Sequence, residues 1–559
     1  MEKIITRKVK ESLKNALEQA AFRAREEGKL TFDELPPVIL EVPKDKSHGN
    51  FASNLALILA KTVKKAPRDT AQIILQSMQS NPYIAKSEVA GPGFINFYLN
   101  DSWLTEVLET IIAEKAHYGD NSDLTGVNVQ LEFVSANPVG PMVVVNARAA
   151  ALGDTLGNLM SASGAKVWRE YYVNDYGVQV ETLGRSIDAR YRELLGQKVE
   201  FPEDGYRGEY IYDIAREFIA EKGDFYLEFS EPERVKTFKD LGYTRILASQ
   251  KEDLGNYGVH YDCWFSERSL HEQGAVTQIM KDLEEKGLTF KQNGALWLKT
   301  TDYGDDKDRV LTTADGRTTY FTSDIAYHVN KFNRGFNLLI DIWGPDHHGY
   351  IPRMKAALAA LGYDPAQFEV LIAQQINLLK DGQPFKMSKR RGDFITMNDL
   401  LDEVGNDVAR WFFLMRSSDS HLDFDMGLAK SQSNENPVFY VQYALARICS
   451  IFRQASPEQL NLVFGPELLQ YWDEEEKSLV EKAAHFPDLI SETAIKREPH
   501  RLTGYLLELA TMFHSYYNRR RFISDDMEQT RARLALAKGL SFVLQRGLAL
   551  LGVSAPEKM

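Results

Sequence analysis

The segment VNVQLEFVSANP, at residues 127–138, decides the fold class of this chain of 559 residues. It opens with β-branched and aromatic side chains and closes on turn-forming residues. A long stretch with helical periodicity follows over residues 147–163. Strand, turn and helix in that order are the first half of a parallel βαβ unit, so the sequence predicts an α/β core with a parallel sheet.

The rest of the chain is organised around that core. The αβ pattern is predicted to resume with strands at 320–322, 337–344 and 368–372, and segments after residue 398 show only helical periodicity. We therefore expect three parts, which are a small α/β domain at 1–120, a parallel-sheet core at 121–397 with a mostly helical insertion at about 184–300, and an all-helical region at 398–559.

Composition narrows the functional classes. With 44% hydrophobic and 26% charged residues, the chain is typical of a soluble globular protein. The net charge of −13 disfavours a general nucleic-acid coat, although from residue 501 onward nine basic residues face five acidic ones. Two cysteines, Cys263 and Cys449, are too few for a disulfide framework or a Cys-rich zinc site, which favours a reducing compartment.

No membrane or export segment is expected. No apolar run approaches the roughly 18 residues needed to span a bilayer. The N-terminus places Ile5, Val9, Leu13 and Leu17 between charged residues at every fourth position, which indicates an amphipathic helix rather than a signal peptide. We predict a cytoplasmic protein without membrane contact.

The most specific motif is Lys386-Met387-Ser388-Lys389, which follows Asp381-Gly382. Two lysines three residues apart suit a mobile loop that closes on a polyphosphate and neutralises charge on its leaving group. An exposed basic turn is the alternative. The position of the motif, after an αβ pattern and before an all-helical region, favours the phosphate-binding role.

This motif resembles the KMSKS loop of class I aminoacyl-tRNA synthetases, whose core is a Rossmann-type parallel sheet. Residues 132–148 are similar to the E-x-x-S-A-N-P-x-G-P stretch of arginyl-tRNA synthetases and to the HIGH-like motif that follows it. Val143, Val144, Val145 and Asn146 stand at the four positions of H-x-G-H. Asn146 can donate a hydrogen bond where the second histidine would lie, whereas Val143 cannot.

The resemblance implies a set of site residues, most of them near the predicted carboxyl ends of core strands, where nucleotides bind parallel sheets. The implied catalytic residues are Lys386, Ser388, Lys389 and Asn146. The implied ATP-binding residues are Val143, Asn146, Gly344, Asp346, Lys386, Met387 and Lys389. The implied arginine-binding residues are Glu132, Ser135, Asn137, Tyr320, Asp324 and His347.

The terminal regions resemble RNA-binding domains of the same family. Residues 1–120 are similar to the N-terminal domain that meets the tRNA elbow, which implies that Phe94 stacks on a loop base and Asn96 hydrogen-bonds one, whereas Phe97 is expected in the core. The helical region resembles the anticodon-binding domain. Its implied RNA contacts are Tyr443, Arg519, Arg520 and Met559.

The family resemblance implies ATP-dependent ligation of L-arginine to tRNA(Arg) through an arginyl-adenylate, with ATP and Mg²⁺, no tightly bound cofactor and a monomeric enzyme. The adjacent His347 and His348 lack ligand partners at metal spacing, so we expect no metal site. The altered HIGH motif leaves one alternative open, a synthetase-like protein that binds tRNA without adenylation. Another nucleotidyl transferase of the HIGH superfamily would not explain both terminal domains.

Overall fold

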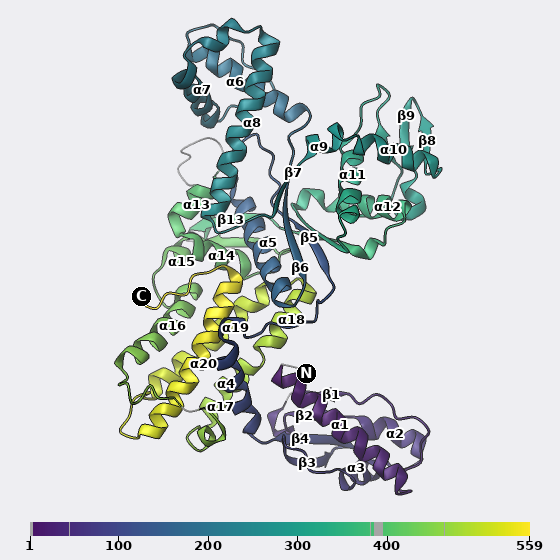
Figure 1. Cartoon of the computed structure of the whole chain (residues 1–559), viewed down its shortest axis with the longest axis vertical. Coiled ribbons are helices and arrows are strands. Elements are labelled where there is room, and N and C mark those ends of the chain that lie inside the picture. The colour runs from purple at the N-terminus through teal and green to yellow at the C-terminus, as the bar shows by residue number, and fades with distance from the viewer. Residues whose placement is uncertain (1–3, 44, 381, 385–394, 463) are drawn as a thin grey trace.

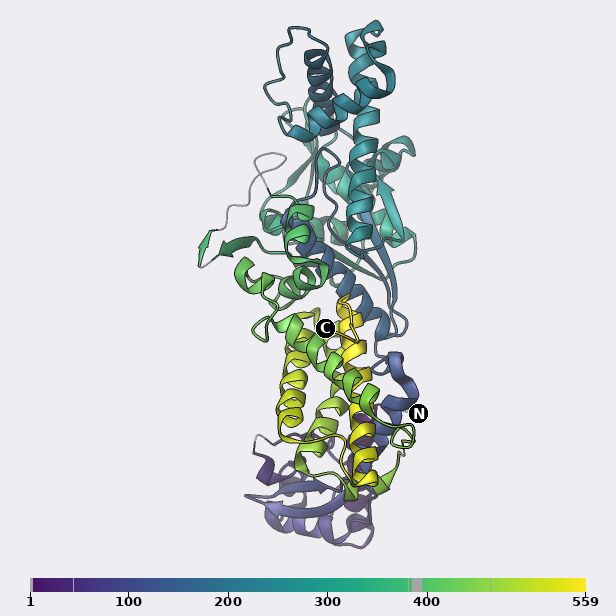
Figure 2. The same cartoon turned by 90° about the vertical axis from the view of Figure 1, so that its left-hand side faces the viewer.

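The computed structural model describes residues 4–43, 45–380, 382–384, 395–462 and 464–559. The molecule is elongated, with the parallel-sheet core between a helical projection at one end and a helical bundle at the other (Figure 1). Seen from the side, the N-terminal domain lies beyond the bundle, far from the projection (Figure 2).

The N-terminal domain is a four-stranded antiparallel sheet with helices packed on it. Its strands, in the order β1-β2-β4-β3, are Leu40–Glu41, Phe51–Ser53, Phe94–Leu99 and Ile84–Ala90. The helices are α1 (Ile5–Glu26), α2 (Leu55–Val63) and α3 (Pro67–Gln76), and α4 (Ser102–Glu114) leads to the core. The predicted stripe Val9, Leu13 and Leu17 is buried in α1, and Phe97 is in the core as expected.

The core is a five-stranded sheet whose strands are all parallel, which confirms the predicted fold class. Its order is β12-β11-β5-β6-β7, with bounds Phe368–Ile372, Leu338–Trp343, Asn128–Glu132, Lys166–Val173 and Cys263–Ser266. Helix α5 (Val144–Ala162) follows β5. The chain order reverses between β5 and β11, so a crevice opens at the carboxyl ends of these two strands.

The sequence prediction of a strand at residues 320–322 was wrong. These residues begin helix α11 (Tyr320–Asn333), and the nearby strand is β10 (Arg309–Thr312). A three-residue run of β-favouring residues is too short to outweigh the helical periodicity after it. The range 184–300 is mostly helical, as expected, but it also contains strand β7 of the core sheet, whose place is set by pairing with the distant β6.

Helices between β6 and β7 form the projection at the top of Figure 1. They are α6 (Val178–Leu194), α7 (Glu209–Lys222) and α8 (Glu231–Asn256), and they close on their own apolar core around Leu183, Ile187 and Phe238. A second lobe carries α9 (Glu267–Glu272), α10 (Ala275–Glu285), α12 (Ile351–Leu361) and a small sheet of β8 (Thr289–Gln292), β9 (Ala295–Leu298) and β10.

The C-terminal region is a helical bundle with one short strand. Its helices are α13 (Met397–Val404), α14 (Asn406–Leu414), α15 (Met426–Lys430), α16 (Pro437–Gln454), α17 (Glu474–Ala484), α18 (Phe486–Lys496), α19 (His500–Arg519) and α20 (Met527–Leu551). Strand β15 (Leu422–Asp425) corrects the expectation of helices alone after residue 398. It pairs with β13 (Ile376–Lys380), which also pairs with β14 (Gln383–Pro384).

Helix α20 is the one helix in the described ranges that is long and apolar enough to cross a membrane. The sequence shows no uninterrupted apolar run here, because charged residues stand between the apolar ones. Within the protein, 72% of that window is buried. Such burial is typical of the core helix of a bundle.

The end of α20 is joined to the catalytic core through Arg410 of α14, which is 1% exposed. Its Nε donates to the carbonyl oxygen of Leu551 at 2.9 Å, and its guanidinium pairs with Asp154 of α5. Gly552 has φ +67°, and a Cβ at this position would collide with the Arg410 guanidinium. The helical bundle and α5 therefore share one buried ion pair.

We expect Arg410→Met to lower the free energy of unfolding by about 3–5 kcal/mol, because Asp154 is left with a longer, 3.8 Å contact to Arg169 and the carbonyl oxygen of Leu551 loses the Arg410 donor. Lys281→Met, which removes an exposed ion pair with Glu285, should change the stability little. Urea unfolding followed by far-UV circular dichroism compares the variants with the parent. Equal stability of both variants would contradict the role given to Arg410.

Candidate active site

A cavity of about 520 Å³ lies in the crevice between the ends of β5 and β11. All six residues predicted to bind arginine line it, together with Gly344 from the predicted ATP set. The sequence did not point to the other side chains in its wall, chiefly Tyr172, Asn174, Tyr327, His328, Asp341, Trp343 and Tyr350.

The end of β5 makes an irregular turn that returns Ser135 to Glu132. Val134 and Ser135 have φ values of +72° and +40°, and for a β-branched residue such as Val134 this region is strained. The turn lets Ser135 Oγ donate to Glu132 Oε1 at 2.9 Å while accepting the Tyr172 backbone N–H at 3.1 Å. Strain at this turn therefore orients the Glu132 carboxylate.

Helix α11 supplies the acidic group at the other side of the cavity. Asp324 accepts a hydrogen bond from Tyr350 Oη at 2.5 Å. Burial raises the pKa of Asp324, although the bond from Tyr350 opposes the shift. Tyr320, one turn earlier on the same helix, is 62% exposed at the rim. The helix therefore directs an anionic group and an aromatic ring at the same opening.

Glu267, at the start of α9, is an acidic neighbour that the sequence analysis missed. It is 3% exposed, and its Oε2 makes no hydrogen bond with the described residues. Burial and the nearby Asp324 and Asp175 raise the pKa of Glu267 to about 8. The sequence analysis missed Glu267 because this residue lies within the range that was predicted to be an insertion.

A set of buried ionisable groups lies behind the cavity. The Nζ of Lys331 lies 2.7 Å from Glu132 Oε2 and 2.8 Å from Asp341 Oδ1. His328 Nε2 lies 2.9 Å from the other oxygen of Asp341, and His328 Nδ1 lies 2.7 Å from the Asp324 carbonyl oxygen. Lys331 and Asp341 are both 0% exposed. These contacts connect the Glu132 side of the cavity with the Asp324 side.

The predicted nucleotide side is built around the start of α5. The Val143 backbone N–H donates to Asn146 Oδ1 at 2.8 Å, so the amide oxygen of Asn146 caps its own helix. Val143 also forms an isolated bridge with Thr396, and Met397 N donates to Met142 O at 2.8 Å. The segment that follows residue 394 is therefore fixed directly beside the start of α5.

Gly344 and Asp346 follow β11. A Cβ at Gly344 would come within 2.6 Å of Asp346 Oδ1, so a side chain there would displace the exposed Asp346 carboxylate. Asp346 and His347 are exposed, and Asp346 Oδ2 lies 3.6 Å from His347 Nε2. Lys386, Met387, Ser388 and Lys389 lie outside the described residues. Among the residues that are described, no group of three or more His, Cys, Asp or Glu side chains could hold a metal ion.

The predicted RNA contacts differ in exposure. Phe94 is half-buried, and Asn96 is 3% exposed on β4, which contradicts a direct base contact by its side chain in this conformation. Arg519 and Arg520 are exposed, but they pair with Glu475 and Asp473 at 2.6 and 2.7 Å. Met559 is 53% exposed.

Tyr443 belongs to a cluster that the sequence analysis did not recognise. The guanidinium of Arg447 lies 4.4 Å from the centroid of the Tyr443 ring and 4.7 Å from that of Tyr517. These two cation–π contacts hold together the two rings, which belong to neighbouring helices of the bundle.

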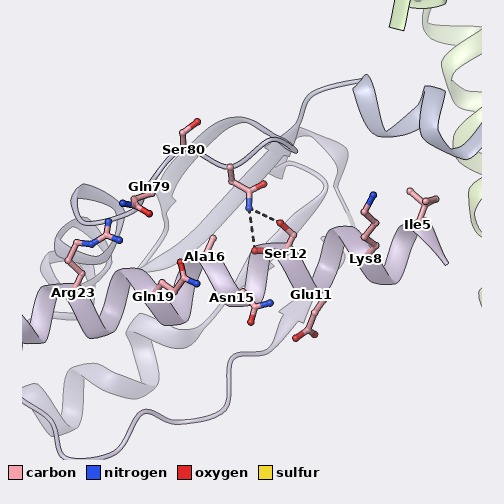
Figure 3. Close-up of a pocket in the computed structure, with 11 residues that line it drawn as sticks. Ile5, Lys8, Glu11, Ser12, Asn15, Ala16, Gln19, Arg23, Gln79 and Ser80 are labelled. Carbon is pink, nitrogen blue, oxygen red and sulfur yellow. Dashed lines mark hydrogen bonds between the residues drawn. The ribbon is translucent and has the colours of Figure 1, made fainter. Parts of the chain in front are cut away.

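A second cavity, of about 530 Å³, lies on the N-terminal domain between α1 and the loop at residues 79–81 (Figure 3). Two residues of its lining are bonded to each other, because Asn81 Nδ2 donates to Ser12 Oγ at 2.9 Å. Amides and hydroxyls dominate the lining, and Lys8 at one end is paired with Glu106. This groove lacks the convergent carboxylates of the cavity at the sheet, which we take as the candidate active site.

Three family models match successive parts of the chain. The arginyl tRNA synthetase N-terminal domain matches residues 7–99, the class I tRNA synthetase (R) catalytic domain matches 107–413, and the DALR anticodon binding domain matches 441–559. A parallel-sheet catalytic domain with its cavity at the strand switch point, joined to these two domains, defines a class I aminoacyl-tRNA synthetase.

Similar proteins match this chain over almost its whole length. An arginine–tRNA ligase of Geobacillus kaustophilus is 48% identical, with 99% of this chain and 100% of the relative covered. One of Listeria welshimeri is 50% identical, with 94% and 95% covered. A crystal structure from Campylobacter jejuni superposes with a TM-score of 0.77 at 36% identity, covering 82% of this chain and 100% of that one. The Thermus thermophilus arginyl-tRNA synthetase shares the fold, with a TM-score of 0.72 at 22% identity and 98% and 100% coverage.

The chain therefore belongs to the arginyl-tRNA synthetase family. Its activity is that of an arginine–tRNA ligase, which implies ATP, arginine and tRNA(Arg) as substrates.

The pKa of Glu267 generates a prediction about stability. Above its ordinary pKa of 4.5 the unfolded chain releases a proton that the folded protein retains up to about pH 8, so this group makes stability fall as the pH rises between the two values. Glu267→Gln should abolish that decline, so it should be more stabilising, relative to the parent, at pH 8 than at pH 5. Urea unfolding at pH 5, 6.5 and 8 measures the difference. Glu272→Gln, an exposed change on the same helix, is the control, and parallel pH profiles for the two variants would contradict the assignment.

Proposed function

We propose that arginine binds in the cavity between β5 and β11 with its guanidinium at Asp324 and its α-ammonium at Glu132. The observation that carries this proposal is a single cavity with an oriented carboxylate on each side, on a catalytic domain of the arginyl-tRNA synthetase family. Arginine carries one positive charge on its α-ammonium and one on its guanidinium, and these two charges are complementary to the two carboxylates.

The guanidinium end needs several acceptors. A guanidinium carries five N–H donors in a fixed planar fork and stays charged at every physiological pH. Asp324 offers a carboxylate already hydrogen-bonded by Tyr350, and Glu267 lies close by with an unbonded oxygen. Tyr320 closes the rim. Lysine, with a compact ammonium, would leave part of this acceptor set unsatisfied, so the arrangement favours arginine.

The reaction follows in two steps. A carboxylate oxygen of arginine attacks the α-phosphorus of Mg-ATP, the bond to the bridging oxygen of pyrophosphate breaks, and arginyl-adenylate forms. A ribose hydroxyl at the 3′ end of tRNA(Arg) then attacks the arginyl carbonyl carbon, and AMP leaves. Neither step needs a covalent bond to the protein, so positioning and charge neutralisation supply the rate.

Charge neutralisation on the leaving pyrophosphate is assigned to Lys386 and Lys389, with Ser388 and Met387 in the same motif. Support comes from the fixed ends of this segment. On one side β14 pairs with β13, and on the other Thr396 bridges to Val143 at the start of α5. The adenine and ribose would lie between this point, Gly344 and Asp346, with Asn146 contributing its amide nitrogen.

The terminal regions are assigned to tRNA. The N-terminal domain, residues 1–120, would meet the tRNA elbow near Phe94, and residues 398–559 would bind the anticodon loop near Tyr443, Arg519, Arg520 and Met559. The aromatic and basic side chains exposed there are the groups that stack on unpaired bases and contact phosphates. A cytoplasmic, monomeric enzyme with Mg²⁺ entering as Mg-ATP completes the proposal.

The arginine orientation is tested with Asp324→Asn. This change keeps the shape of the side chain but removes its charge, so the KM for arginine should rise about 10- to 150-fold, the value of a charge-assisted hydrogen bond. The KM for ATP should change little. Asp315→Asn, an exposed aspartate paired only with Arg317 and Thr313, serves as the control in the same aminoacylation assay. An unchanged arginine KM in Asp324→Asn would place the guanidinium elsewhere.

The role of the lysine motif is tested at the adenylation step. Lys389→Ala should slow adenylate formation about 10²–10³-fold, as when one preorganised donor is lost from other active sites, with little change in the arginine KM. Asn146→Ala should cost less, about 1 kcal/mol, since one neutral hydrogen bond is involved. Rapid-quench measurement of adenylate with tRNA present compares the two. A parental rate in Lys389→Ala would refute the assignment, and absence of adenylate in the parent would favour a protein that only binds tRNA.

A further inference from the structure

Three carboxylates lie side by side across the centre of the parallel sheet. Asp341 of β11 is in register with Glu132 of β5, and Glu132 is in register with Glu170 of β6. Neighbouring strands are about 4.8 Å apart, so these groups are adjacent. Their residues are 0%, 7% and 0% exposed, respectively. Without compensation, three buried negative charges this close would repel one another strongly.

Helix α11 supplies the compensation from one face. His328, Lys331 and Arg334 follow one another at intervals of three residues, which places them on one side of the helix. Arg334 binds both oxygens of Glu170 at 2.6 and 2.7 Å. Lys331 bridges Glu132 and Asp341, and His328 contacts the remaining oxygen of Asp341. Each carboxylate thus has a cationic partner from the same helix.

His328 contacts residues on both sides of the cavity. Its Nδ1 lies against the Asp324 carbonyl oxygen, and its Nε2 lies against Asp341 Oδ2. Lys331 contacts the other oxygen of Asp341 and also Glu132. These two basic side chains of α11 therefore reach both acids of the central strands.

We propose that Lys331 is a positioning residue for arginine recognition, which holds Glu132 as an oriented carboxylate at the α-ammonium end of the cavity. Lys331 fixes Oε2 of Glu132 while Ser135 fixes Oε1, so the carboxylate is held from both sides. This inference rests on the proposed function, because it takes Glu132 as the partner of the α-ammonium. It adds that a buried lysine, which contacts no substrate, sets the ionisation state of Glu132, on which the contact with the α-ammonium depends.

The electrostatic balance supports this role. Burial raises the pKa of Glu132, and the charge of Lys331 limits that rise. Burial opposes ionisation of Asp341 as well, but Lys331 and His328 outweigh it and hold the pKa of Asp341 below its ordinary value. The ionisable groups around Glu132 are Lys331 and His328 from α11, Asp341 from β11 and Glu170 from β6, and the phenols of Tyr172 and Tyr327 lie close by. Loss of Lys331 would therefore leave Glu132 protonated well above its ordinary range.

The experiment compares arginine with 5-guanidinopentanoate, which is arginine without its α-amino group. The ratio of the inhibition constant of this analogue to the arginine KM, measured in aminoacylation from pH 6 to 8, reports the contact with the α-ammonium. In the parent this ratio should be about 10 to 150 and nearly independent of pH. In Lys331→Met it should fall close to one at pH 6 and rise with pH, by up to about ten-fold per unit, as Glu132 ionises.

Two further variants keep the test decisive. Asp341→Asn leaves Lys331 entirely to Glu132, so its ratio should stay high and independent of pH. The double variant Lys331→Met/Asp341→Asn removes one charge of each sign and should reproduce the pH dependence of Lys331→Met even if the single variant is too unstable to purify. Arg234→Met, which breaks the buried ion pair with Asp188 in the helical projection, controls for general destabilisation and should keep the parental ratio.

The outcomes separate the inference from the proposal beneath it. A ratio near one at every pH in Glu132→Gln, together with the pH-dependent ratio in Lys331→Met, supports both. A collapsed ratio in Glu132→Gln but a pH-independent ratio in Lys331→Met overturns the role of Lys331 alone, as does a pH-dependent ratio in Asp341→Asn. A parental ratio in Glu132→Gln overturns the proposed orientation of arginine itself.

Discussion

The bridge that Lys331 makes between Glu132 and Asp341 is the interaction on which the site depends. Parallel strands in register bring like side chains together, and here they bring together carboxylates at the edge where substrates bind. The adjoining positions of β11, β5 and β6 at this register are all acidic, so they do not neutralise one another. The cations must come from a helix packed across the strand ends, and α11 does this with the same turns that present Asp324 to the cavity. The helix therefore neutralises one set of acids and displays another, so its register along the sheet determines both ends of the arginine site.

The nucleotide side obeys a different constraint, which is the joining of segments far apart in the chain. Helix α5 begins beside Thr396, and its buried Arg148 donates to the carbonyl oxygens of Gln374 and Ser417 at 2.7 and 2.9 Å. Further along α5, Asp154 pairs with Arg410, which also binds the end of α20. One helix thus contacts the segment after the lysine motif, the end of the sheet and the anticodon-binding bundle. A rigid displacement of the bundle would therefore be transmitted to the start of α5, beside Thr396.

The features that could be predicted from the sequence are those with a local sequence signal, and the features that were missed depend on contacts with distant parts of the chain. Strands β11 and β12 have apolar runs of their own, and β5 begins a run of β-favouring residues. All six arginine-binding candidates line one cavity, but only Glu132, Ser135, Asn137 and His347 lie at the ends of these strands, whereas Tyr320 and Asp324 lie on α11. Strands β7 and β15 were missed because each has only four residues and owes its conformation to a distant partner. His328 and Lys331 were missed for a related reason. The spacing from Asp324 to His328 and Lys331 is a helical stripe, but the assignment of residues 320–322 to a strand concealed it. Glu267 carries no local signal, since only tertiary packing brings it to Asp324.

Charged side chains are paired differently at the sheet and at the surface proposed to face RNA, because the former are buried and the latter are exposed to solvent. Buried carboxylates must be matched one by one, and the structure matches them with fixed distances from a single helix. At the surface, Arg519 and Arg520 are paired with Glu475 and Asp473, but exposed pairs of this kind contribute little and exchange partners readily. A protein of net charge −13 can therefore bind a polyanion if its exposed arginines leave carboxylates for phosphates when RNA approaches. Exchange of this sort would release counterions from the RNA and weaken with salt, whereas the proposed recognition of arginine by buried carboxylates would be screened far less. The same kinds of side chain would thus give salt-sensitive RNA binding at the surface and salt-resistant amino-acid selection inside.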